Sequence, residues 1–258
     1  MTGINSNYGY MYRQRSQEEA EIGYLLATLA SAAVLKALPS FSNPFEKQMK
    51  KEWANNALYK DAFIKSISNS GLDKVGVKLM HVPSGITDPK LLDVARGLNA
   101  FYTPDAKQVF LNADKATIAG FHELGHAMNH LKSKTGKFLQ SFRRPGYAIA
   151  GLMGTVALFS RSKPKDAKRN VFDFVQDNCG KIAFAAMLPT VIEESMASYK
   201  GIKLAKQAGL SDALVKNLRK FYGKALLSYG GYALLIGFST FIASKITEIF
   251  TRPKKIEY

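Results

Sequence analysis

The sequence predicts a mainly helical α+β fold, in which a small β-sheet accompanies membrane-associated helices. Apolar stretches with helical spacing run through most of the chain, and hydrophobic residues make up 47% of its 258 residues. Two of these stretches, residues 22–38 and 225–244, are long enough to cross a bilayer. Three shorter runs, residues 75–82, 101–103 and 108–111, have the composition of strands. We therefore expect a helical membrane part combined with a small sheet.

The N-terminal residues 1–21 are expected to form a mobile tail, followed by a transmembrane helix over residues 22–38. Lys36 is the one charge in this helix, and its amine can reach the membrane interface. Glu18 and Glu19 precede the apolar run, where a secretory signal peptide has positive residues. The segment is therefore predicted to be a membrane helix rather than a signal peptide.

Residues 43–202 are expected to form the next domain, which opens with a helix from Asn43-Pro44 to Ser70-Gly71. The strand runs follow, with a turn at Pro104-Asp105 between the second and the third. Apolar residues at helical spacing then predict a helix around residues 117–131. This helix is thus expected to follow the sheet directly.

The pentapeptide His122-Glu123-Leu124-Gly125-His126 lies in that predicted helix. Residues four apart share one face of a helix, so both imidazoles can bind one zinc ion. The chain has 4 histidines, and chance would produce this pattern in on the order of a few in a thousand sequences of this length. We therefore predict one zinc ion per chain, bound by His122 and His126, with Glu123 as the base that takes a proton from water.

A catalytic zinc ion needs a third protein ligand and an open position for water. Glu193 and Glu194 follow an apolar run, and a carboxylate in apolar surroundings is costly unless it is paired or bound to a metal. Either glutamate could be the ligand; the alternative is that one or both begin a solvated helix face. His130 would lie about 12 Å from His122 along the helix axis, so we expect it at the surface or beside the site.

Three segments together resemble the membrane gluzincins, the zinc peptidases of the HtpX and CAAX-prenyl protease type. These segments are the pentapeptide, the run Asn99-Ala100-Phe101-Tyr102-Thr103-Pro104 and the pattern Glu194-x-x-Ala197-Ser198. The resemblance covers residues 75–202 and implies a zincin-like metallopeptidase core. It implies Glu194 as the third zinc ligand, with Glu193 as the fallback.

The same resemblance implies that Asn99 and Ala100 line the substrate cleft; on the residues alone, an ordinary turn is an equal alternative. The family carries an aspartate where this chain has Ser198, so a carboxylate beside the metal ligands is missing. The family also places an apolar hairpin between the two halves of its zinc site. That hairpin corresponds to residues 147–192.

The two apolar runs of this hairpin, residues 147–160 and 182–192, are short for independent spans, at about 21 Å and 17 Å of helix. We expect them to enter or cross the membrane together with neighbouring residues; a soluble helical core is the alternative. The loop at residues 161–169 is basic and would lie opposite an equally basic catalytic side. The orientation in the membrane is therefore left open.

Residues 203–258 are expected to form C-terminal helices, including the transmembrane helix at residues 225–244. This run carries no charge, and twenty helical residues extend about 30 Å, the thickness of the hydrocarbon core. The Gly230-Gly231 pair and Gly237 within it would let another helix approach closely.

The charge balance indicates a membrane partner. The chain has 36 basic and 20 acidic residues, a net charge of +16, and its basic residues flank the apolar runs. Such flanks bind anionic lipid headgroups. No recognised nucleic-acid motif accompanies the charge, so nucleic acid is not an expected partner. The single cysteine, Cys179, excludes an internal disulfide framework and a zinc ribbon.

These features predict a membrane-bound, multi-pass zinc endopeptidase that hydrolyses a polypeptide, with membrane proteins among its candidate substrates. Tyr199 and His130 are the candidate donors to the oxyanion. Two alternatives stay open. One is a soluble or peripheral zinc peptidase, and the other is a catalytically inactive membrane scaffold that keeps a zinc site, which Ser198 in place of aspartate permits.

Overall fold

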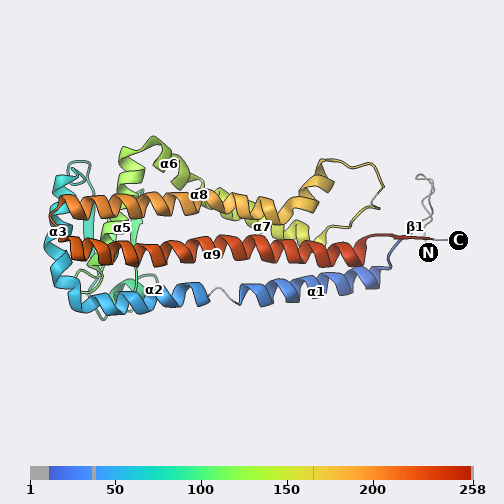
Figure 1. Ribbon diagram of the computed structural model, residues 1–258, viewed down its shortest axis with the longest axis horizontal. Coiled ribbons are helices and arrows are strands. Elements are labelled where there is room, and N and C mark those ends of the chain that lie inside the picture. The colour runs from blue at the N-terminus through green and yellow to red at the C-terminus, as the bar shows by residue number, and fades with distance from the viewer. Residues whose placement is uncertain (1–11, 37–38, 165, 257–258) are drawn as a thin grey trace. The chain divides into compact units, whose positions relative to one another are not determined.

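The structure, a computed structural model, describes residues 12–36, 39–164 and 166–256 (Figure 1). These residues are mostly helical and include one three-stranded sheet, so the predicted mainly helical α+β class is confirmed. In chain order the elements are β1 (Tyr12–Arg13), α1 (Gln17–Leu35), α2 (Pro39–Glu52), the 3₁₀ turn η1 (Trp53–Asn55), α3 (Asn56–Asn69), β2 (Lys78–His81), α4 (Leu92–Ala95), β3 (Ala100–Thr103), β4 (Gln108–Leu111), α5 (Thr117–Lys132), α6 (Lys134–Ser141), α7 (Arg143–Phe159), α8 (Val171–Gln207), α9 (Asp212–Thr251) and β5 (Lys254–Lys255).

The chain divides into two compact units. Unit 1 takes the described residues of Met1–Leu38, Arg144–Leu188 and Gly231–Tyr258, and unit 2 takes those of Pro39–Arg143 and Pro189–Gly230. The small sheet and the His122 to His126 pentapeptide both belong to unit 2.

The sheet of unit 2 has the strand order β2-β4-β3. β2 pairs with β4 in parallel, and β3 pairs with β4 antiparallel, with Ala100 opposite Leu111. The strands predicted at residues 101–103 and 108–111 are confirmed as β3 and β4. The run predicted from residue 75 forms a strand only from Lys78, because Gly76 turns the chain with a φ of +86°. β3 is an edge strand, so one side of its main chain has no strand partner in the sheet.

The single helix expected from Asn43-Pro44 to Ser70-Gly71 is divided into α2, η1 and α3. The break at η1 brings Asn56, the first residue of α3, against the start of α5. The Asn56 side chain donates to the Ala113 carbonyl at 2.8 Å and accepts from the Thr117 amide at 2.8 Å. Because Thr117 is the first residue of α5, Asn56 stabilises the N-terminus of that helix.

The core of unit 2 surrounds α5. Phe121, Leu124 and Ala127 of this helix are buried in one cluster with residues of α3, the sheet and α9. The ring of Phe121 meets the ring of Phe63 edge to face, with centroids 5.4 Å apart. The apolar side of α5 is therefore fixed by the core, and its polar side is available for the chemistry described below.

Unit 1 begins with an N-terminal segment that only partly matches the expected tail over residues 1–21. Residues 1–11 lie outside the described residues, while Tyr12–Arg13 pairs with Lys254–Lys255. α1 starts at Gln17 rather than at Ile22, because Ser16 and Glu19 form a capping box at its N-terminus.

Helices of unit 1 approach one another at small residues. Gly23 of α1 packs against Phe250 of α9, and the two helices lie side by side in Figure 1. Gly237 of α9 contacts the backbone of α8, where a Cβ on Gly237 would lie 3.1 Å from the Gly180 carbonyl oxygen. The expectation of a close helix approach is thus confirmed at Gly237, but not at Gly230, where an added Cβ would meet nothing within 4 Å.

Among the helices in the described part of the chain, α9 alone is long and apolar enough to cross a membrane. The expectation of several spans is not supported on this criterion. α1 has glutamates in its first turn and α7 has only 17 residues. The run at 182–192 is part of α8, whose 37 residues also include charged segments.

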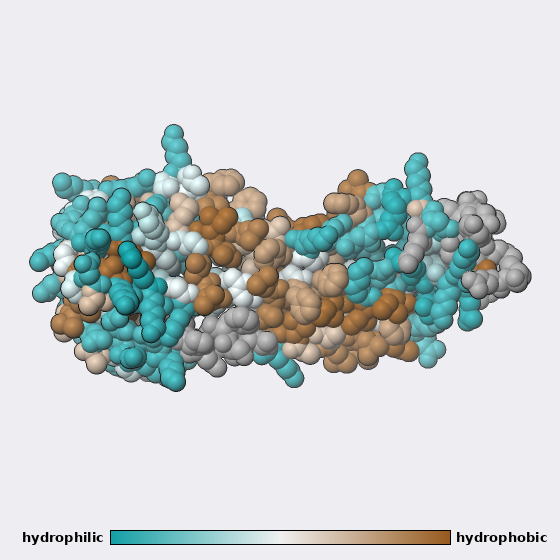
Figure 2. Space-filling model, in the orientation of Figure 1, coloured by the Kyte–Doolittle hydropathy of each residue, from teal (hydrophilic) through white to brown (hydrophobic). Residues whose placement is uncertain are grey.

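Large apolar side chains are nevertheless exposed on unit 1. They include Leu25 and Leu29 on α1, Leu152 and Phe159 on α7, Phe174 on α8, and Leu234 and Phe238 on α9. In Figure 2 hydrophobic residues gather over α1 and the helices of the same unit beside it. A continuous apolar surface of this kind marks a contact with lipid or with another apolar surface.

Candidate metal centre

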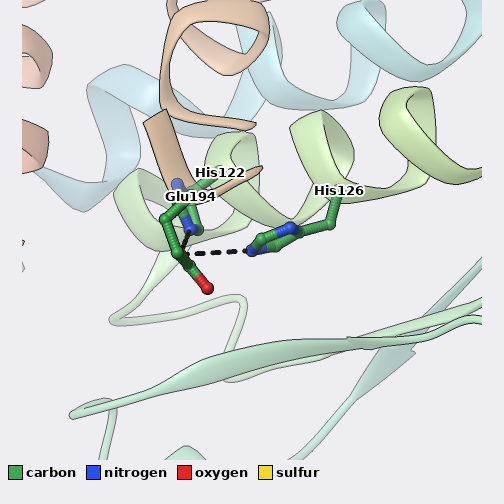
Figure 3. Close-up of side chains that lie close together, drawn as sticks. All are labelled: His122, His126 and Glu194. Carbon is green, nitrogen blue, oxygen red and sulfur yellow. Dashed lines mark hydrogen bonds and ion pairs between the residues drawn. The ribbon is translucent and has the colours of Figure 1, made fainter. Parts of the chain in front are cut away.

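The two histidines of the pentapeptide lie on the same side of α5 and face a carboxylate on α8. His122 Nε2 is 2.9 Å from Glu194 Oε2, and His126 Nε2 is 3.6 Å from the same oxygen. Figure 3 shows both imidazoles directed at Glu194. Ligand atoms of all three residues lie within 4.8 Å of one another. Two imidazole nitrogens and one carboxylate oxygen are the donor set of many catalytic zinc sites, so these residues fit a zinc ion.

Close packing of α5 on α8 brings these residues together. A Cβ added to Gly125 would collide with the main-chain carbonyl of Ala197 on α8, and one added to Gly201 would collide with the carbonyl of Phe121 on α5. Glycine at both positions lets the two backbones touch. Gly125 therefore permits the helix contact that brings Glu194 to the two histidines.

Glu193 has a different role from Glu194. Its Oε1 atom accepts from His126 Nδ1 at 2.9 Å, from the Asn129 amide at 2.8 Å and from the Gln140 amide at 2.9 Å. The bond to Nδ1 fixes the His126 tautomer in which Nε2 is free to bind a metal. The fallback ligand of the sequence analysis thus lies behind His126, where it orients the imidazole.

The charge state of Glu193 follows from these contacts. Burial alone would raise the pKa of its carboxyl group, but the hydrogen bonds from His126 and Asn129 and the charge of Arg143 outweigh it and lower the pKa to about 2. Glu193 is therefore a carboxylate at neutral pH, and its oxygen can accept the hydrogen bond from His126 Nδ1.

Ser198 contacts the Nδ1 atom of His122, as Glu193 contacts the Nδ1 atom of His126. Its Oγ lies 3.1 Å from His122 Nδ1, and a hydroxyl can accept a hydrogen bond from that nitrogen. The aspartate of the resembled family is thus replaced by a shorter neutral acceptor, while a carboxylate beside the ligands is supplied by Glu193. Burial, followed by the charge of His126, lowers the pKa of His122 to about 4, which keeps its imidazole neutral at pH 7.

Arg143, the first residue of α7, contacts both glutamates. Its guanidinium pairs with Glu194 Oε1 and lies 3.8 Å from Glu193 Oε2. Both carboxylates are almost fully buried, with side chains 0% and 1% exposed, and these outer oxygens have no partner other than Arg143 among the described residues. The arginine therefore supplies the compensating charge, and it leaves Oε2 of Glu194 to the histidines. Sequence reasoning missed Arg143, because nothing in its local pattern links it to residues so far along the chain.

Glu123 lies beside the three candidate ligands. It lines a cavity of about 240 Å³ together with His122, Asn99, Ala100 and Tyr222. Its carboxylate makes no hydrogen bond with the part of the chain that the structure describes, and it stays accessible to water from the cavity. The structure thus brings Asn99 and Ala100, at the start of edge strand β3, to the same cavity as the pentapeptide.

The two candidate oxyanion donors lie elsewhere. Tyr199 is 68% exposed and lines a separate hollow, and His130 Nδ1 is 3.1 Å from the Tyr102 hydroxyl. Tyr222, which the sequence analysis did not select, lies beside the candidate metal ligands. Its ring centroid is 5.4 Å from that of His122. Its hydroxyl donates to the Ile118 carbonyl at 2.7 Å. Only tertiary packing reveals this residue, because Tyr222 is separated from the pentapeptide by a hundred residues of chain.

Comparisons of the chain with protein-family models, with curated proteins and with solved structures find no match.

Proposed function

We propose that this chain is a membrane-attached zinc endopeptidase. One observation carries the proposal: His122, His126 and Glu194 converge on one point beside Glu123, in a cavity that also includes the start of an edge strand. The resemblance to the membrane gluzincins in the same residues supports it, and with it a zincin-like core. A structural zinc site would need no unpaired carboxylate beside the ligands.

In this proposal His122, His126 and Glu194 hold the metal, and Glu193, Ser198 and Arg143 orient those ligands. A bound zinc ion acidifies water and polarises the carbonyl of the scissile peptide bond. Glu123 takes a proton from water and passes it to the leaving amine. Its position next to His122, with no hydrogen bond to another described residue, suits that exchange.

The substrate is an extended polypeptide. The unpaired side of β3 offers main-chain donors and acceptors to such a segment, and Ala100 of β3 lies at the cavity. Asn99 adds a side-chain amide at the same point. A peptide paired along β3 would therefore pass Glu123 and the metal ligands.

Attachment to the membrane rests on α9 and on the exposed apolar surface of unit 1. α9 passes the length and composition test for a span, and large apolar residues of α1, α7 and α8 are exposed in the same unit. We propose that these helices accompany α9 in the bilayer. Small residues at their contacts, such as Gly180 and Gly237, are typical of helix packing in lipid.

The decisive variant is Glu123→Gln, which keeps the side-chain shape and removes the base. Detergent-purified wild type and variant are incubated with a peptide library made from whole-cell protein, and new peptide termini are identified by mass spectrometry. The wild type is expected to cleave, with a rate at least about 100-fold higher than that of the variant, while both retain zinc. Equal cleavage by the two proteins, or no cleavage by zinc-loaded wild type, would contradict the proposal.

A further inference from the structure

A second hollow in unit 2 lies between α8 and α9, with a volume of about 530 Å³. Three basic residues line it: Lys203 and Lys206 from α8 and Arg219 from α9. Its other side is less polar and includes Leu226 and the exposed ring of Tyr199. The hollow therefore combines a cationic part with an apolar part.

None of the three cations forms an ion pair with an acidic residue in the part of the chain that the structure describes. Lys224, by contrast, donates a hydrogen bond to the Gln48 side chain at 2.9 Å. Three uncompensated positive charges around one concave surface attract an anion. The ligand is expected to carry at least one negative charge that can contact more than one of these side chains.

The place of the hollow along α9 indicates the kind of anion. Arg219 precedes residue 225, where the uncharged run begins, by six residues, or about 9 Å of helix. The headgroup layer on each side of a bilayer is about 5–8 Å thick. A run that starts at the edge of the hydrocarbon therefore puts the Arg219 backbone at the outer boundary of this layer, from which its long side chain can reach the lipid phosphates. Leu226 then lies at the edge of the hydrocarbon, and Tyr199 matches the aromatic residues found at such interfaces.

We propose that this hollow binds the headgroup phosphate of an anionic phospholipid, with Lys203, Lys206 and Arg219 as its ligands. The proposal rests on the entry of α9 into the membrane, and it does not require peptidase activity. The bound headgroup would also lie beside the metal centre, because Ser198 and Tyr222 line the hollow and both contact His122.

Native mass spectrometry of the full chain in detergent tests the proposal. The protein is titrated with phosphatidylglycerol, with phosphatidylcholine as the zwitterionic comparison, and the retained lipids are counted. The wild type is expected to retain phosphatidylglycerol at least about tenfold more strongly, since each lost charge contact weakens binding several-fold. The triple variant Lys203→Gln, Lys206→Gln, Arg219→Gln is expected to lose this preference.

Two further variants control for net charge and folding. The triple variant Lys65→Gln, Lys74→Gln, Lys90→Gln removes three exposed cations outside the hollow and is expected to behave as wild type. The charge-conserving Lys203→Arg, Lys206→Arg, Arg219→Lys is expected to keep the preference. An equal loss in both charge-removing variants would overturn the proposal. So would complete displacement of the lipid by millimolar inorganic phosphate, which would make the hollow a site for free phosphate.

The zinc-free variant His126→Ala separates this proposal from the peptidase proposal. It is expected to retain phosphatidylglycerol as wild type does, even though it cannot hold the metal. Loss of the lipid preference in His126→Ala would overturn an independent headgroup site, whereas absence of peptide cleavage in wild type would leave the lipid result unchanged.

Discussion

At the scale of single residues, Glu193 and Glu194 are neighbours in the sequence but contact different atoms of the two histidines. Glu194 presents one oxygen to both histidines, while Glu193 accepts from the far nitrogen of His126. Arg143 contacts the remaining oxygen of each. The site is thus a cluster in which both buried carboxylates share one guanidinium and each also contacts an imidazole.

Arg143→Gln should destabilise the zinc-free protein more than the zinc-loaded one. Without the guanidinium, two buried carboxylates are left uncompensated, and breaking such a pair costs up to about 3–5 kcal/mol, less here because Arg143 is partly exposed. A bound zinc ion would give Glu194 a positive partner again, so the loss of Arg143 should cost less in the zinc-loaded protein. Thermal unfolding of both forms measures the difference, with Arg144→Gln, an exposed neighbour, as the control. Equal effects of the two substitutions would show that Arg143 does not compensate the glutamates.

The depressed pKa of His122 predicts a pH dependence of the zinc-free protein. The folded group titrates at about 4, whereas the unfolded chain takes the proton near 6.5. Between these values the unfolded state binds more protons, so the contribution of His122 to stability falls as the pH is lowered from about 6.5 to 4 and then levels off. Unfolding midpoints of wild type and His122→Gln in chelator should therefore converge on acidification. A constant difference between them over this range would refute the assignment.

Some residues of the site could be predicted from the sequence, and others could not. The pattern of His122, Glu123 and His126 depends on helical spacing alone, and the structure brings the two histidines to Glu194 as the resemblance implied. Arg143, Gln140, Asn129 and Tyr222 reach the site only through tertiary packing, which no local pattern encodes. Tyr199, a candidate oxyanion donor on the sequence, instead lines another hollow.

At the scale of elements, the site depends on the contact between α5 and α8. Gly125→Ala should disrupt this contact, because the new methyl group would collide with the Ala197 carbonyl, which belongs to backbone and cannot rotate away. Overpacking of this kind costs about 1–3 kcal/mol, more than the gain in helix propensity. The expected result is a lower unfolding temperature and weaker zinc binding.

Gly223→Ala is the matched control for that substitution, since Gly223 lies in a helix with nothing within 4 Å of the added Cβ. It should leave the unfolding temperature unchanged or raise it slightly. A Gly125→Ala protein as stable and as zinc-competent as Gly223→Ala would mean that the two helices do not touch as described.

The strands β3 and β4 were predictable because β-branched and aromatic residues flank the turn at Pro104-Asp105, and both strands lie where that composition indicated. Burial alternates along β4 but not along β3. The bounds of the long helices were harder to predict. No sequence pattern indicated the break at η1, and this break places Asn56 at the start of α5. The apolar run 182–192 and the glutamates share one helix, α8, because no turn residues separate them and Pro189 does not end the helix.

At the scale of the whole molecule, we expect the chain to be an integral membrane protein. After alkaline carbonate treatment of membranes, the full chain should stay in the pellet and should enter solution only with detergent, because we propose that α9 and the exposed apolar residues of unit 1 contact lipid. A soluble protein that carries the same net charge of +16 serves as the control for electrostatic adsorption. Release of the chain by alkali would indicate a peripheral zinc peptidase instead.

Metal content tests the central claim most directly. Elemental mass spectrometry of detergent-purified protein after exhaustive dialysis should find about one zinc ion per folded chain in wild type, Glu123→Gln and Tyr199→Phe. His126→Ala and Glu194→Ala should contain none, and Glu193→Gln should bind zinc about 10–100-fold more weakly. Folded wild type without zinc, or unchanged zinc in Glu194→Ala, would contradict a metal centre built from His122, His126 and Glu194.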